Sequence, residues 1–163
     1  MHYTLFHMMY SFALKISEIG NHNKNLFHAI RYEDCKLDSN YNLLTLRLLT
    51  YKHSANPAKF RYRCPPSLTG HFQQYQTLRG HQPGLLFQHQ NGDSFSRKFV
   101  LNNLRYILSS IGITPNQYNT HGFRAGRASD MATAGYTGDQ ISLLGRWHSD
   151  AYKTYIKPPV IQV

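Results

Sequence analysis

A long apolar run lies near the start of the chain, between Tyr3 and Ile19. Hydrophobic side chains occupy most of its positions, and neither glycine nor proline interrupts it, which is typical of a buried helix. Gly20 follows directly and favours a helix end there. We therefore expect a mostly buried helix over this run. Its two charges, Lys15 and Glu18, are three residues apart, and the ordinary interpretation is a snorkelling lysine beside a neighbouring carboxylate.

The pattern changes in the middle of the chain and predicts a small β-hairpin. Leu43–Thr50 alternates imperfectly and is rich in Leu and Thr, and Lys59–Arg63 follows as a second strand. Ser54–Pro57 lies between them and carries turn residues. The preceding Leu26–Tyr32 indicates only a short helix or strand. We expect the two strands to pair in an antiparallel sheet.

Most of the remaining chain has the spacing and the boundary residues of helices. The expected helices run from Ser67 to about Leu78, from a cap at Ser94 or Ser96 to about Ile111, over His121–Ala134 before Gly135, over Gly138–Leu144 before Gly145, and over Ala151–Ile156 before Pro158. With 163 residues, of which 41% are hydrophobic, the chain is long enough for one packed domain. The pattern predicts a mostly helical α+β fold with a small antiparallel sheet.

The charge of the chain narrows the choice of partner. Its formal net charge is +10 and its isoelectric point is near 9.8. No aspartate or glutamate occurs between Ser39 and Gly92, although lysines and arginines recur there. Such a field favours a polyanion, most often DNA or RNA. A basic surface that is merely solvated has the same composition and stays open as an alternative.

Several other classes of function are disfavoured. No run approaches the roughly 20 apolar residues of a membrane helix, and Met1–Tyr10 lacks the basic region that begins a signal peptide. Cys35 and Cys64 are too few for a disulfide framework, so we expect idle thiols in a reducing compartment. The histidines lack the spacing of metal ligands, acidic residues are scarce and no glycine-rich phosphate loop is present. We therefore expect neither a metal nor another cofactor.

Residues that can carry chemistry concentrate between His121 and Tyr155. On a helix His121 and Arg124 share a face, because they are three residues apart. An imidazole beside a guanidinium fork suits a phosphate, whose oxygens accept charge-assisted hydrogen bonds. Trp147 follows within a Gly-Arg-Trp-His cluster. Tyr155 then ends the segment with a hydroxyl that can act as a nucleophile.

This ordered set resembles the C-terminal motif of the tyrosine recombinases, or phage integrases, which reads His-x-x-Arg, then glycine with His or Trp, then Tyr. The sequence Gly145–Tyr152 is most similar to recombinases of eukaryotic mobile elements, of the DIRS and Crypton type. Ala13–Ile19 is similar to the segment that holds the family's first catalytic arginine and an acidic residue that steadies it. The resemblance covers nearly all of residues 1–163. It implies the family's catalytic domain, mostly helical with a small antiparallel sheet, without the N-terminal core-binding domain.

The resemblance implies DNA strand breakage and rejoining through a 3′-phosphotyrosine intermediate. Tyr155 matches the nucleophile that attacks a phosphodiester, while Arg124 and Lys15 match the groups that hold its nonbridging oxygens. His121 would assist proton movement, and Trp147, at the family's His/Trp position, would pack on the site with its indole N–H free for the phosphate. Because the phosphotyrosine conserves the energy of the broken bond, neither ATP nor a metal is required.

Further expectations follow from the same resemblance. Lys52 in the hairpin matches the lysine that enters the minor groove and protonates the leaving 5′ oxygen. The residues expected to contact double-stranded DNA are Lys52, Lys59, Arg61, Arg63 and Arg146. The family also implies a tetramer on two duplexes. It implies a nuclear location in a eukaryote, and otherwise a location in the cytoplasm or nucleoid.

The sequence leaves alternatives open for the nucleophile, for the His/Trp position and for the activity itself. Tyr152 is the second candidate for the nucleophile, and Arg146 or His148 could occupy the His/Trp position. Lys15 stands where the family has an arginine, so the charge is kept but the planar fork is lost. The alternative function is accordingly a domesticated or truncated domain that binds DNA without cutting it. A protein-interaction module that retains only the fold is a further alternative.

Overall fold

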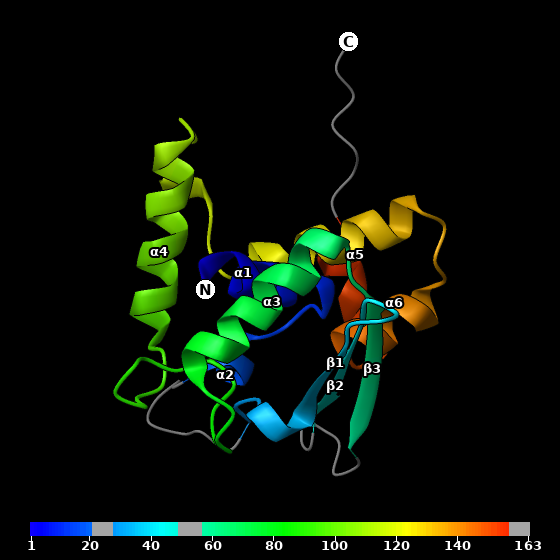
Figure 1. The fold of residues 1–163 in the computed structure, drawn as a ribbon. Helices are drawn as coiled ribbons and strands as arrows, with labels where there is room; N and C mark the ends of the chain where they lie inside the picture. The colour runs from blue at the N-terminus through cyan, green and yellow to red at the C-terminus, as the bar shows by residue number, and fades with distance from the viewer. Residues whose placement is uncertain (21–27, 49–56, 157–163) are drawn as a thin grey trace.

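The computed structural model describes residues 1–20, 28–48 and 57–156. A three-stranded sheet lies at one end of the molecule, helices cover it, and α4 stands apart from the sheet (Figure 1). In chain order the elements are α1 (His2–Ser11), α2 (Ile16–Ile19), η1 (Tyr32–Asp34), β1 (Cys35–Asp38), β2 (Leu43–Leu48), β3 (Ala58–Arg63), α3 (Pro66–Arg79), α4 (Arg97–Ser110), η2 (Pro115–Gln117), α5 (Gly122–Thr133), α6 (Gly138–Gly145) and η3 (Ser149–Thr154).

The first apolar run is buried as predicted, but the prediction of one continuous helix is wrong. The run is divided into α1 and α2 by a bend at Ala13, whose φ is 46°. Lys15 is extended (φ −83°, ψ 154°), and its backbone N–H donates to the Glu18 carboxylate across 2.7 Å. That hydrogen bond satisfies an N–H at the start of α2, so the carboxylate begins a new helix where the apolar pattern showed no interruption.

The predicted hairpin is part of a sheet with the strand order β1-β2-β3, antiparallel throughout. Strand β2 pairs with β3 from Leu43 opposite Arg63 to Leu48 opposite Ala58. The short strand β1 was not predicted. Because side chains alternate along a strand, Leu44 and Leu46 face the core, whereas the basic residues of β3 face outward. The end of the predicted strand Leu43–Thr50, the predicted turn as far as residue 56, and the start of Leu26–Tyr32 lie outside the described residues.

The helices of the second half follow the predictions closely, with small shifts at their ends. Ser96 caps α4, where its side-chain oxygen accepts from the Phe99 N–H across 3.1 Å. Helix α3 begins one residue before the predicted cap at Ser67, because Pro66 occupies its first position. Its predicted apolar face is buried at Leu68, Phe72 and Tyr75. The final helical turns are η3, a 3₁₀ helix.

Two groups of buried side chains hold these elements together. The larger joins α1, the sheet and α3, and the smaller is centred on Ala128, Met131 and Ile141. Trp147 and Tyr155 pack against the smaller group, so both residues lie on the part of the core that α5 and α6 form. Cys35 and Cys64 are buried free thiols, and burial raises the pKa of each. Among the described helices none has the length and hydropathy to cross a bilayer.

Candidate active site

His121 and Tyr155 come from opposite ends of the motif and meet at the surface. His121 directly precedes α5, and Tyr155 directly follows η3. The His121 Nε2 and the Tyr155 Oη are 2.9 Å apart, within hydrogen-bond distance, and the two rings are tilted with centroids 5.2 Å apart. An open cavity of about 410 Å³ adjoins both side chains. The hydroxyl of Tyr155 therefore has an imidazole nitrogen within hydrogen-bond distance on one side and space for a ligand nearby.

Arg124 lies one helical turn beyond His121 and is 2% exposed. Its Nη1 donates to the Ala13 carbonyl and its Nη2 to the Gly145 carbonyl, the latter across 2.7 Å. Its guanidinium lies over the rings of Trp147 and Tyr155, at 4.7 and 5.8 Å from their centroids. The Arg124 Nε is buried and finds no hydrogen-bond partner among the described residues. The cation is thus fixed beneath the hydroxyl that the motif predicts as nucleophile.

The charge of Arg124 is itself perturbed. Burial and, after it, the charge of the neighbouring Arg146 lower the pKa of Arg124 to about 10, although Glu18 and Tyr155 act in the opposite direction. At neutral pH the guanidinium still carries its positive charge. Because the guanidinium is buried, solvent screens its charge less than it screens the charge of an exposed side chain.

Trp147 is the residue of the His/Trp position that packs at the site. Arg146 adopts a left-handed conformation (φ 56°) that ends α6 and directs the chain toward η3. The Trp147 ring then lies 4.8 Å from the Tyr155 ring, and its Nε1 is buried without a described hydrogen-bond partner. His148, the other alternative, is exposed. The arrangement therefore favours Trp147 over both alternatives.

Tyr152, the second candidate for the nucleophile, packs against α6 and not beside His121. A Cβ added to Gly138 would lie 2.0 Å from the Tyr152 hydroxyl, so this tyrosine packs against the beginning of α6. It belongs to the smaller core group with Ile141. Because the hydroxyl next to His121 is that of Tyr155, the geometry favours Tyr155 as the nucleophile.

Positive charges surround His121. Burial lowers the pKa of His121, and the charges of Arg124, Arg97 and Lys15 lower it further. Lys15 therefore lies near enough for its charge to act on His121. Arg97 begins α4 and was not predicted; no local pattern marks a residue that only the packing of α4 brings toward the motif. Together these charges favour the neutral imidazole, which can accept a proton.

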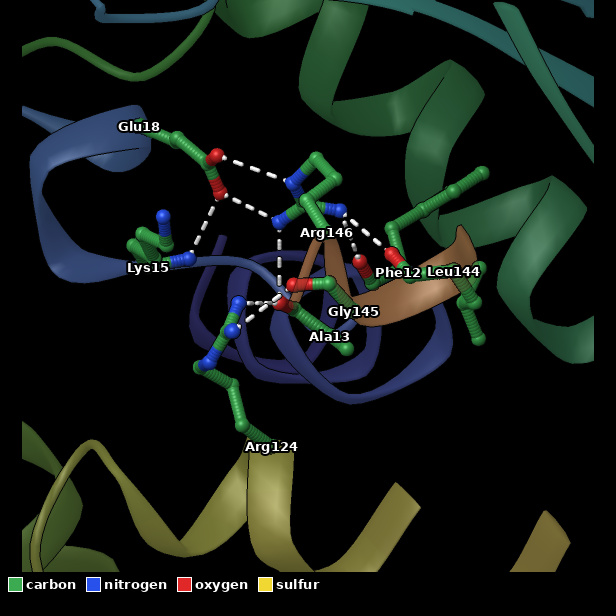
Figure 2. A network of polar contacts seen from close by, with 8 residues as sticks. All are labelled: Phe12, Ala13, Lys15, Glu18, Arg124, Leu144, Gly145 and Arg146. Carbon is green, nitrogen blue, oxygen red and sulfur yellow. Dashed lines mark hydrogen bonds and ion pairs between the residues drawn. The ribbon is translucent and has the colours of Figure 1, made fainter. Parts of the chain in front are cut away.

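The prediction that Arg146 contacts DNA needs correction. Its side chain is 1% exposed, and it forms an ion pair with Glu18, which is 2% exposed. Figure 2 shows the guanidinium enclosed between Glu18 and backbone carbonyls, on the side of Ala13 opposite Arg124. A guanidinium bonded in this way has an interior role and cannot reach a phosphate on the surface.

The other predicted DNA contacts divide into two groups. Lys59, Arg61 and Arg63 are exposed on one face of β3, as the alternation along that strand requires. Lys52 lies outside the described residues. In the ranges 1–20, 28–48 and 57–156, no group of three or more His, Cys, Asp or Glu side chains could hold a metal ion.

No family model matches the sequence, and no curated protein matches it. Solved structures do. A Tn1549 transposon integrase in complex with a circular intermediate DNA matches with a TM-score of 0.60 at 15% identity, over 96% of this chain and 54% of the other. The XerH site-specific recombinase matches in its pre-cleavage complex with difH (TM-score 0.68, 13% identity, 94% of this chain and 41% of XerH). The post-cleavage complex of XerH with palindromic difH matches with a TM-score of 0.70 at 11% identity, over 96% of this chain and 41% of XerH.

These similarities establish the architecture. The chain has the mostly helical fold with a small antiparallel sheet of the tyrosine recombinase catalytic domain. It spans about half the length of the integrase chain and about two-fifths of the XerH chain. The closer likeness to DIRS and Crypton recombinases stays a prediction, as does the organisation of residues 1–163 as one domain.

Proposed function

We propose that this chain breaks and rejoins DNA strands with Tyr155 as the nucleophile, in recombination or integration of a mobile element. The observation that carries the proposal is the hydrogen-bonded pair of His121 Nε2 and Tyr155 Oη, 2.9 Å apart, above the buried guanidinium of Arg124. The structures with similar folds include a transposon integrase and a site-specific recombinase, both in complex with DNA. The net charge of +10 supports a polyanionic substrate.

The proposed first step is an attack on phosphorus. The Tyr155 oxygen forms a bond to the phosphorus of a phosphodiester while the bond to the 5′ oxygen breaks, leaving a 3′-phosphotyrosine and a free 5′-hydroxyl. A free phenol has a pKa of about 10 and keeps its proton at neutral pH. Neutral His121 is placed to accept that proton, and its lowered pKa keeps the imidazole in the accepting form.

The remaining roles follow the charges around the site. Arg124 stabilises the charge that develops on the nonbridging oxygens. The Nε of Arg124 and the Nε1 of Trp147, which have no described hydrogen-bond partner, are the donors available to them. Lys15 adds a second cation. Lys52 protonates the leaving 5′ oxygen. Attack by a 5′-hydroxyl of a partner strand reverses the step and rejoins the DNA, and a tetramer on two duplexes would bring such strands together. In a eukaryotic cell this substrate implies a nuclear location.

A second candidate function is DNA binding without cleavage, and Lys15 is the observation that favours it. A lysine offers a point charge where an arginine offers two parallel donors to the phosphate. Loss of one such donor geometry costs about 10²-fold or more in rate when the donor acts on transition-state charge. Because the carbonyls of Ala13 and Gly145 hold Arg124 and no side chain at position 15 is needed for this, the fold would persist in either case.

The test is covalent trapping on nicked suicide substrates, with sites selected by binding from random duplexes and with mobile-element ends. We expect an adduct on a denaturing gel that forms in the presence of a chelator. Tyr155→Phe should abolish this adduct and leave DNA affinity within about twofold, since one hydroxyl contributes little to a phosphate-dominated interface. Tyr152→Phe is the matched control and should retain the adduct. Trapping that survives in Tyr155→Phe and disappears in Tyr152→Phe would show that the nucleophile is misassigned.

The same assay separates the two candidate functions. Salt-sensitive DNA binding without any adduct would favour the binding function. In that case Lys15→Arg, which restores the planar fork, should produce an adduct. If neither the wild-type chain nor Lys15→Arg binds DNA in a salt-sensitive way, the retained fold serves another purpose and both candidates fail.

A further inference from the structure

Arg146 uses every N–H of its guanidinium in the interior of the protein. Nε and Nη2 donate to the two oxygens of Glu18, across 3.1 and 2.7 Å. Nη1 donates to the carbonyls of Phe12 and Leu144, across 3.0 and 2.7 Å, and Nη2 donates also to the carbonyl of Ala13 across 3.0 Å. Five donors thus meet five acceptors, which is the full capacity of an arginine. Nothing remains for a ligand.

The carbonyl of Ala13 connects this interior arginine to the site. It accepts from the Nη2 of Arg146 and also from the Nη1 of Arg124, which approaches from the opposite side (Figure 2). The bend at Ala13, with φ at 46°, turns this carbonyl out of the helical direction and presents it between the two arginines. A single backbone oxygen therefore fixes one end of the Arg124 guanidinium, and Arg146 fixes that oxygen.

The negative charge of Glu18 offsets the repulsion between Arg124 and Arg146. Two buried guanidinium groups repel each other, and the charge of Arg146 indeed lowers the pKa of Arg124. Glu18 binds Arg146 in the two-pronged way that suits a carboxylate and a guanidinium. Its second oxygen also accepts the N–H of Lys15, so the same carboxylate sets the backbone from which Lys15 projects. The ion pair lies behind Arg124 and outside the reach of DNA.

We propose that Arg146 is a positioning residue for Arg124. Through the Ala13 carbonyl it holds the Arg124 guanidinium against the Trp147 and Tyr155 rings, where it faces the scissile phosphate. Arg146 itself contacts neither substrate nor nucleophile. A lysine at this position would keep the charge but could not span the carboxylate and three carbonyls. The part of this inference that concerns cleavage rests on the proposed function, whereas the placement of Arg124 does not.

Trp147 provides a readout that needs no activity, because it is the only tryptophan of the chain. Arg124 covers its ring at 4.7 Å, so release of Arg124 should increase quenching of Trp147 fluorescence by acrylamide. We expect increased quenching in Arg146→Lys and in Arg124→Lys, with no further increase in the double variant, since both changes remove the same contact. Additive effects in this cycle would overturn the proposal.

Arg79→Lys is the matched control. Arg79, like Arg146, donates to three backbone carbonyls, those of Gly80, Gln82 and Leu85, but it lies at the end of α3. Loss of its bonds should leave Trp147 quenching unchanged even if the protein becomes less stable. Increased quenching in Arg79→Lys, equal to that in Arg146→Lys, would mean that general loosening explains the signal, and the proposal would fail.

A second readout addresses cleavage. A scissile methylphosphonate lacks one charged nonbridging oxygen, so an enzyme with a well-placed Arg124 should cleave it more slowly than the normal phosphate. In Arg146→Lys the ratio of the two rates should fall about tenfold, because a misplaced cation no longer distinguishes the substrates. Rates reduced in parallel, with the ratio unchanged, would indicate a purely structural role and overturn the proposal.

A folding failure of Arg146→Lys would not end the test. The double variant Glu18→Gln, Arg146→Gln removes both charges of the ion pair together, so neither charge is left buried without its partner. We expect the double variant to fold, judged by circular dichroism, with increased Trp147 quenching. Quenching like that of the wild-type protein would overturn the proposal. If the wild-type chain forms no adduct, the proposed function fails, while the quenching cycle still decides the role of Arg146.

Discussion

At the scale of single residues, the proposed mechanism depends on the protonation state of His121. An imidazole that accepts a proton must be neutral, and an imidazolium beside several cations is unfavourable. Burial is the first cause of its lowered pKa, and the charges of Arg124, Arg97 and Lys15 add to it. The cations that would bind phosphate therefore also keep the proton acceptor neutral. One electrostatic arrangement serves both purposes.

This coupling predicts the effect of Arg97→Gln. Removal of a positive charge makes the imidazolium less unfavourable, so the pKa of His121 should rise toward its ordinary value of about 6.5. Titration of the His121 ring protons by NMR measures the change, and the acidic limb of any cleavage profile should move to higher pH by the same amount. Arg105→Gln, an exposed change on the same helix, serves as control. An unchanged pKa in Arg97→Gln, or an equal rise in Arg105→Gln, would contradict this coupling.

Local spacing explains which site residues the sequence could predict. His121 and Arg124 share a helical turn, and Trp147 and Tyr155 follow in a short segment that folds back onto it. Arg146 was misassigned because its partner Glu18 lies 128 residues away, and only the left-handed end of α6 turns its side chain inward. In a basic chain, the sequence around an arginine does not indicate that the side chain will pair with a buried carboxylate.

At the scale of elements, the end of α6 determines how Trp147 meets Tyr155. Gly145 ends this helix, and a Cβ added to it would lie 1.7 Å from the Trp147 ring. Its carbonyl also accepts from Arg124. The close approach of the indole to this backbone therefore requires glycine, and the requirement comes from packing rather than from a left-handed φ.

Gly145→Ala should accordingly displace Trp147 from the site. We expect destabilisation of about 1–3 kcal/mol, typical of a forced side-chain shift in a packed region, and loss of the covalent adduct. Denaturant unfolding and the trapping assay measure the two effects. Gly70→Ala is the control, because Gly70 lies within α3 with no atom near an added Cβ; it should stabilise the protein by about 0.5–1 kcal/mol. A wild-type unfolding midpoint and adduct in Gly145→Ala would contradict the packing argument.

Elements with their own boundary signals were predictable, and elements set by tertiary contacts were not. Ser96 and Pro66 mark the starts of α4 and α3 in the sequence itself. The bend at Ala13 carries no glycine or proline. The bond from the Lys15 N–H to Glu18 and the bonds from two distant arginines to the Ala13 carbonyl stabilise it. Strand β1 is only four residues long, and its pairing with β2 defines it more than its composition does.

At the scale of the whole molecule, part of the excess of basic residues behind the net charge of +10 lies on one face of the sheet. Lys59, Arg61 and Arg63 project from one face of β3, and the paired strand β2 presents Arg47 opposite Lys59 on the same face. The residues facing the core from these strands are apolar, so the alternation separates a basic surface from the hydrophobic interior. Such a surface suits the backbone of a duplex, whose recognition is dominated by phosphate contacts.

Replacement of Arg61 and Arg63 by glutamine tests whether this face contacts DNA. Each lost phosphate contact should lower the salt dependence of binding, the slope of log affinity against log salt, by about 0.9, so the double variant should lose about 2. Fluorescence anisotropy with labelled duplex at several salt concentrations measures the slope. The same charge change at the exposed Arg31 and Arg105 is the control, because it lowers the net charge equally without altering β3. An equal change of slope in both variants would mean that net charge alone governs binding. A slope altered only by the β3 variant would assign phosphate contacts to this face, because released counterions report contacts rather than distant charge.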